Sequence, residues 1–133
     1  MNWPLPLRRA TALAFFMFVN WLMLAPGAAF ENVHMLFSQQ DKIAHLGIFG
    51  GLTELTLWSL PAQWTLRGRF LMLLTVMLVY GAGIELVQPL LPDSGRSAEW
   101  MDLVADAIGI AVGGGLFRAL ADTQAPPDNN DGN

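Results

Sequence analysis

Four long apolar stretches, separated by short polar or proline-containing segments, make up most of this chain. They cover residues 10–30, about 42–60, 70 to about 91, and 98 to about 120. A helix of about 20 apolar residues is long enough to cross a bilayer core of about 30 Å. The pattern therefore predicts an all-α, polytopic integral membrane protein, folded as a bundle of four transmembrane helices.

The composition agrees with a protein whose solvent is lipid. Hydrophobic residues make up 53% of the 133 residues and charged residues only 14%, against about 25% charged in typical soluble domains. The net charge of −4 and the lack of a basic run give no electrostatic support for nucleic-acid binding. Without cysteine there is no disulfide or thiolate site. The expected partner is the lipid bilayer; a protein partner or homo-oligomer remains open.

The first apolar stretch has a competing interpretation as a cleaved signal peptide. Arg8 and Arg9 precede it, and small residues follow it near Gly27. The stretch is long for such a peptide, and the later stretches require a membrane under either interpretation. We therefore expect a single four-helix transmembrane domain over residues 1–121. Residues 122–133 are polar and are expected to form a disordered tail.

The distribution of basic residues predicts the orientation, because cytoplasmic loops carry an excess of Lys and Arg. One side of a four-helix path receives most of the basic residues, namely Arg8, Arg9, Arg67, Arg69 and Arg118. The other side receives Lys42 and Arg96. This asymmetry predicts that both termini are cytoplasmic and that loops 27–41 and 92–98 face outward.

Ionisable and amide residues from three predicted helices and one loop gather near the outer face. They are Asp41, Lys42, His45, Glu85, Gln88, Arg96, Asp102 and Asp106. An acid at the centre of a bilayer costs roughly 2.5–3.5 kcal/mol, so acids at membrane depth usually pair, face a water-filled cavity or serve a function. Asp41 is also a plausible helix N-cap, as is Ser97 for the fourth helix.

Spacings of three and four place several of these residues on shared helical faces. Gly81, Glu85 and Gln88 form one face of the third helix. The corresponding face of the fourth helix is formed by Asp102, Asp106, Gly109 and Gly113. Its Gly-xxx-Gly pair predicts close packing against a neighbour, which would place both aspartates inside the bundle.

The second helix carries a comparable face of small residues. It consists of Gly47, Gly50, Gly51 and the deep carboxylate Glu54, for which we favour a structural role, protonated or hydrogen-bonded between helices.

We assign these residues to two groups. The candidate catalytic residues are His45, Glu85, Asp102 and Asp106, and the candidate ligand-binding residues are Asp41, Lys42, Gln88 and Arg96. Lys42 and Arg96 would either hold an anionic headgroup or balance the nearby acids. His45 with three carboxylates is a plausible ligand set for a cation, but no dedicated metal motif is present, so we assign no metal and no cofactor.

In order and spacing, these motifs resemble those of the VanZ-like family of small bacterial membrane proteins. The match consists of Asp41-Lys42-x-x-His45, Glu85-x-x-Gln88, Arg96-Ser97 and Asp102-x-x-x-Asp106-x-x-Gly109-x-x-x-Gly113, over residues 41–116. The chain departs from the family at Asp106, where members often carry Asn. The family is named after an accessory protein associated with teicoplanin resistance. The resemblance implies the bacterial inner membrane, an envelope or antibiotic-resistance setting and a site, but no defined reaction.

Three functions are compatible with this pattern, and whether the chain is an enzyme is left open. The first is a site at the outer face that binds or processes an envelope lipid or lipid-linked precursor. There, His45 and Glu85 would move a proton. The second is a non-enzymatic accessory or scaffold subunit, in which the polar cluster only holds the helices together. The third, which the sequence supports least, is a small proton- or ion-coupled transporter, since no inverted repeat is apparent.

Overall fold

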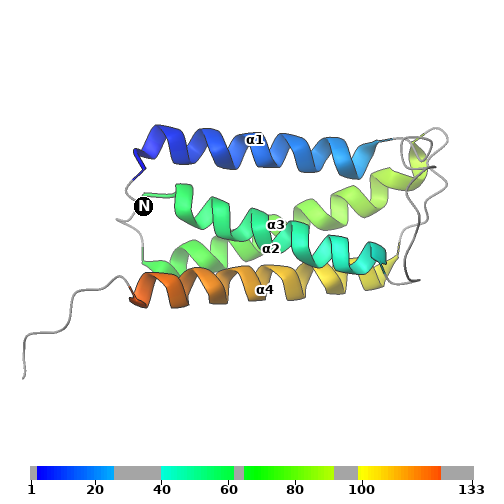
Figure 1. Cartoon of the computed structure of the whole chain (residues 1–133). Coiled ribbons are helices and arrows are strands. Elements are labelled where there is room, and N and C mark those ends of the chain that lie inside the picture. The colour runs from blue at the N-terminus through cyan, green and yellow to red at the C-terminus, as the bar shows by residue number, and fades with distance from the viewer. Residues whose placement is uncertain (1–2, 26–39, 62–64, 92–98, 124–133) are drawn as a thin grey trace, which may run out of the picture.

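The described part of the chain forms a bundle of four α-helices in which each helix runs opposite to the one before it (Figure 1). The computed structural model describes residues 3–25, 40–61, 65–91 and 99–123. Within them lie α1 (Leu5–Leu24), α2 (Gln40–Ser59), α3 (Leu66–Val87), the short 3-10 helix η2 (Gln88–Leu90) and α4 (Trp100–Thr123). The described part of the chain contains no strand, which agrees with the predicted all-α class.

Three of the helices are long and apolar enough to cross a membrane. They are α1, α3 continued through η2, and α4 from Trp100 to Ala121. The helix α2 is not among them, because Asp41, Lys42 and Glu54 lie within its 20 residues. The chain is therefore a multi-pass helical membrane protein, and a bilayer surrounds its apolar surface.

Three helices, α1, α2 and α3, begin before the apolar stretches predicted for them. Helix α1 begins at Leu5, directly after Pro4, and so includes Arg8 and Arg9. Helix α3 begins at Leu66, and the Thr65 hydroxyl caps it by accepting a hydrogen bond from the Gly68 amide. Arg67 and Arg69, which precede the predicted stretch from residue 70, therefore lie within the helix and not in a loop before it, because hydropathy marks only the lipid-buried part of a helix.

Helix α2 begins at Gln40, which places Asp41 inside the first turn and not at the N-cap. Helix α4 begins at Trp100, later than the predicted Ala98, and the predicted cap Ser97 lies outside the described residues. At its other end α4 continues to Thr123, beyond the predicted domain boundary at 121. The rest of the predicted tail, residues 124–133, lies outside the described part of the chain.

The closest helix pair is α2 and α4, which meet through glycines. A Cβ atom on Gly109 would collide with the carbonyl oxygen of Leu46, and one on Gly113 would collide with the carbonyl oxygen of Gly50. Both glycines are buried. The predicted packing role of the Gly-xxx-Gly face is therefore confirmed, and it turns Asp102 and Asp106 toward α2.

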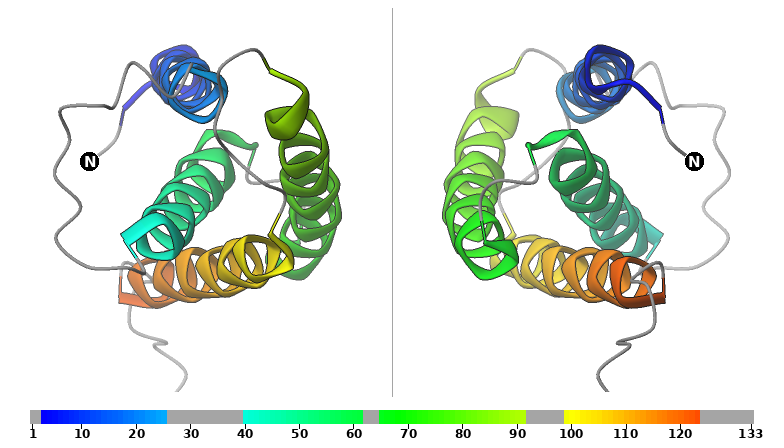
Figure 2. Two further views of the ribbon diagram at one scale, coloured as in Figure 1. Left: turned by 90° about the vertical axis from the view of Figure 1, so that its right-hand side faces the viewer. Right: turned by 90° about the vertical axis from the view of Figure 1, so that its left-hand side faces the viewer.

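Seen end-on, α1 and α4 lie on opposite sides of α2, and α3 stands beside them (Figure 2). The apolar core includes Val19 of α1, Phe49 and Leu52 of α2, Leu73 of α3 and Ile110 of α4. The long axes of all four helices are roughly parallel, so polar residues near one end of each helix reach the same depth.

Candidate functional site

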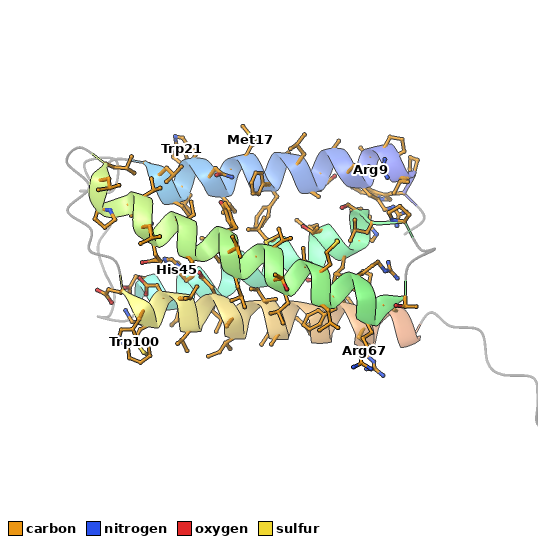
Figure 3. The ribbon with its side chains drawn as sticks, turned by 180° about the vertical axis from the view of Figure 1, so that it is seen from behind. Arg9, Met17, Trp21, His45, Arg67 and Trp100 are labelled. Atoms are coloured by element: carbon orange, nitrogen blue, oxygen red, sulfur yellow. The ribbon has the colours of Figure 1, made fainter. Side chains whose placement is uncertain are left out.

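A buried polar cluster lies near one end of the bundle. It brings together His45 of α2, Glu85 of α3, and Asp102 and Asp106 of α4, none of which is more than 7% exposed. Figure 3 places His45 at the same end as Trp21 and Trp100, whereas Arg9 and Arg67 lie at the opposite end. Because three helices supply these side chains, the cluster exists only in the folded bundle.

The closest contact in the cluster joins α2 to α4. Nδ1 of His45 lies 2.9 Å from Oδ1 of Asp106, which is fully buried. When Asp106 is ionised its carboxylate can only accept a hydrogen bond, and Nδ1–H of His45 then donates to it. In the neutral ring this leaves the lone pair on Nε2. The imidazole is further held by stacking on Phe49, with 6.4 Å between the ring centroids.

Two further carboxylates surround Nε2 of His45. Glu85 Oε1 and Asp102 Oδ2 each lie 4.0 Å from it. The two carboxylates come from different helices, α3 and α4, and each has a second oxygen that is held by another partner. Glu85 Oε2 accepts a hydrogen bond of 3.0 Å from the backbone amide of Glu99. Asp102 Oδ1 lies 3.3 Å from Nζ of Lys42.

Lys42 sits at the edge of this cluster and is paired with three carboxylates. Its Nζ lies 2.8 Å from Glu99 and 3.1 Å from Asp41, in addition to its ion pair with Asp102. Hydrogen bonds to Glu99 and Asp41 raise the pKa of Lys42, so its ammonium stays charged. This geometry favours the alternative in which Lys42 balances the nearby acids.

One of the candidate ligand-binding residues, Gln88, does not join the cluster. Gln88 is buried, but its Nε2 donates to the carbonyl oxygen of Met23 at the end of α1, 3.1 Å away. It therefore ties η2 to α1. Arg96 lies outside the described residues.

Glu99 was not predicted as a site residue, yet it contacts the cluster and Lys42. It precedes the first residue of α4, and both its backbone and its side chain take part. The available signal was its spacing of three residues before Asp102. The contact between Lys42 and Glu99 could not have been predicted, because it depends on how α2 packs against the start of α4.

The small-residue face of α2 divides between two neighbours. Gly50 packs on Gly109 of α4 and Gly51 packs on Phe15 of α1. Gly47 is exposed, with no atom within 4 Å of a Cβ built on it, so it has no packing role within the described bundle. Glu54 is half-buried and lies roughly 13 Å from His45 along the helix axis, at about 1.5 Å per residue.

Chemically, the cluster presents a fixed imidazole nitrogen flanked by two carboxylates. Such an arrangement can accept a proton, donate one, or bind a cation. Four buried carboxylate oxygens have no hydrogen-bond partner among the described residues: Oδ1 of Asp41, Oε1 of Glu85, Oδ1 of Asp102 and Oδ2 of Asp106. Buried polar atoms in native proteins are nearly always satisfied, so these oxygens are available to accept a hydrogen bond or to bind a cation.

Comparison with known proteins supports one family. No curated protein and no solved structure matches the chain. The VanZ/LLP1 family, in contrast, matches residues 6–121, which include all four helices except their outermost residues and every member of the polar cluster. The chain therefore belongs to the VanZ/LLP1 family.

Proposed function

We propose that the polar cluster is a functional site for the headgroup of an envelope lipid or a lipid-linked precursor, which it binds and processes. The observation that carries the proposal is the buried His45–Asp106 pair, whose free Nε2 faces Glu85 and Asp102. Ionisable groups held at membrane depth are costly and are usually functional. A lipid headgroup is the natural ligand, because it lies in the bilayer at the depth where helix ends meet water.

The setting that we propose is the bacterial inner membrane, with both termini in the cytoplasm and the cluster near the outer face. The described arginines of α1 and α3, and Arg118 near the end of α4, lie at the end of the bundle opposite His45. Lys42 is the single Lys or Arg among the described residues at the cluster end. This asymmetry is what the positive-inside rule requires.

We also propose that the apolar part of α2, residues 43–59, is embedded as a fourth membrane helix. Its contacts support this, because α2 lies between α1 and α4 (Figure 2). At about 1.5 Å per residue this part is roughly 25 Å long. Exposed Trp21 and Trp100 at the cluster end suit the headgroup region, where tryptophan is enriched.

The test replaces the chromosomal copy with variants and measures three quantities: membrane abundance, survival under envelope stress, and the lipids that co-purify with the protein. His45→Ala and Glu85→Gln should leave the protein abundant in the membrane. They should reduce survival under envelope stress to that of cells without the protein and change the co-purified lipids. Glu54→Gln is the matched control, because it makes the same chemical change on α2 far from the cluster. Full protection in both cluster variants would contradict the proposal.

A scaffold function is favoured by one specific observation. The pairs His45–Asp106 and Lys42–Asp102 both join α2 to α4 and would hold the bundle together without any ligand. That function predicts that the cluster variants disappear from the membrane. It is excluded if His45→Ala gives a stable, monodisperse protein without activity in the survival assay.

A further inference from the structure

Three side chains of the cluster direct one ligand atom each toward a common point. His45, Glu85 and Asp102 each offer an atom within 4.8 Å of the other two. Nε2 of His45 is 4.0 Å from both Glu85 Oε1 and Asp102 Oδ2. Since the third separation is at most 4.8 Å, a point equidistant from the three atoms lies about 2.1–2.5 Å from each. Usual metal–ligand distances are about 2.0–2.2 Å.

Each of the three ligand residues is held by a partner on its other polar atom. Asp106 holds Nδ1 of His45, the backbone amide of Glu99 holds Oε2 of Glu85, and Lys42 pairs with Oδ1 of Asp102. Metal-binding histidines usually donate their second N–H to a carboxylate or carbonyl, and metal-binding carboxylates are hydrogen-bonded in turn. The contacts of this cluster reproduce that arrangement from residues of three helices.

An independent observation comes from Glu85. Its side chain is 8% exposed, and Oε1 has no hydrogen-bond partner among the described residues. This oxygen lies 4.0 Å from Nε2 of His45, which is beyond hydrogen-bonding distance, so neither atom satisfies the other. A bound cation would satisfy both atoms at once, because it accepts electron pairs from nitrogen and oxygen alike.

A second group of acids nearby provides an internal comparison. Asp41, Glu99 and Asp102 also approach one another closely enough to bind a cation. That group already contains one, since Nζ of Lys42 lies within 3.3 Å of all three. In the group formed by His45, Glu85 and Asp102, Lys42 pairs only with Oδ1 of Asp102. No ammonium among the described residues pairs with the three facing atoms, which are Nε2 of His45, Oε1 of Glu85 and Oδ2 of Asp102.

We propose that His45, Glu85 and Asp102 bind one divalent transition-metal ion, Mn²⁺ or Zn²⁺. One imidazole nitrogen and two carboxylate oxygens form a donor set that suits these ions, and the absence of cysteine disfavours softer metals. Three protein ligands leave coordination positions free for an oxygen ligand. Metal binding does not depend on the lipid proposed above. Where both hold, the ion supplies the positive charge that lets an anionic headgroup approach this acidic cluster.

The test measures metal content of the purified full chain in detergent, with any polyhistidine tag removed. The protein is stripped with a chelator, dialysed against Mn²⁺ or Zn²⁺, and analysed by mass spectrometry for bound metal. We expect about one equivalent per chain and a rise in the unfolding temperature, because an ion that binds only the folded state stabilises it.

Three variants make the result specific. Glu85→Gln keeps the acceptor for the Glu99 amide but weakens the ligand, and should reduce affinity at least 10-fold. Asp106→Asn alters only the group that holds His45 and should reduce affinity about 10- to 100-fold. Glu54→Gln, the same change made away from the cluster, should bind as the wild type does. Circular dichroism and size-exclusion chromatography establish that each variant is folded.

The proposal is overturned if the wild type binds less than about 0.1 equivalent of either ion, or if folded Glu85→Gln binds as tightly as the wild type. The outcome is separable from that of the lipid proposal. A protein that binds no metal but loses protection when His45 is replaced would leave the lipid site intact and make His45 a base. A protein that binds metal, but whose cluster variants survive envelope stress as the wild type does, would support the metal site and contradict the lipid proposal.

Discussion

Nδ1 of His45 lies 2.9 Å from Oδ1 of Asp106, a residue 61 positions further along the chain, and both side chains are buried. The contact fixes the ring of His45 and directs Nε2 toward Glu85 and Asp102. It also explains why the glycine face of α4 matters for the site. Only a close approach of α2 and α4 brings these two residues within hydrogen-bonding distance.

The first prediction concerns this pair. Asp106→Asn should keep most of the stability, because the amide oxygen can still accept from Nδ1 of His45. Asp106→Ala should lower the free energy of unfolding by about 1–3 kcal/mol, the usual cost of leaving a buried polar group unpaired. Reversible unfolding in detergent measures both variants. Equal stability of Asp106→Ala and the wild type would show that the contact does not hold the helices together.

The second prediction concerns the contact between α2 and α4. Gly109→Ala should destabilise the protein by about 1–3 kcal/mol, because the new methyl group meets the carbonyl oxygen of Leu46 and forces the helices apart. Gly115→Ala is the matched control on the same helix, since nothing lies within 4 Å of its Cβ position. Thermal unfolding in detergent compares the two. If Gly109→Ala and Gly115→Ala destabilised the protein equally, the loss would come from replacing a glycine in α4 and not from its contact with α2.

The third prediction concerns the attachment of α1. Gln88→Leu removes the donor to the carbonyl oxygen of Met23 with little change in volume, and should cost about 0.5–1.5 kcal/mol. Hydrogen exchange should increase in the last turn of α1 and remain unchanged in α4. Leu90→Ala, at an exposed position of the same short helix, serves as the control. Unchanged exchange in Gln88→Leu would show that apolar packing alone holds α1.

The fourth prediction concerns orientation. The chain has no cysteine, so single cysteines can be introduced without removing any. Arg67→Cys and Glu99→Cys replace exposed residues at opposite ends of the bundle. With a membrane-impermeant maleimide on intact spheroplasts, Glu99→Cys should be labelled at once and Arg67→Cys only after lysis. The opposite labelling pattern would place the cluster at the cytoplasmic face.

The sequence by itself determined the helical class, the membrane setting and the faces on which the key residues lie. Four apolar stretches and the 3.6-residue period are local properties, so Gly81, Glu85 and Gln88 could be assigned to one face, and Gly109 and Gly113 to another. Helix starts were less accurate, because Arg67 and Arg69 extend α3 beyond its apolar part and Thr65 caps it there.

Only the tertiary structure decided which polar residues meet. Gln88 shares a face with Glu85, yet its side chain donates to the carbonyl oxygen of Met23 at the end of α1, a contact that depends on where α1 packs. Glu99 was not assigned to the site, yet it holds both Lys42 and Glu85. The 3.6-residue period in the sequence gives the direction in which each side chain points from its own helix axis. The distances between helices depend on how closely glycines let the backbones approach, which a single helix pattern does not encode.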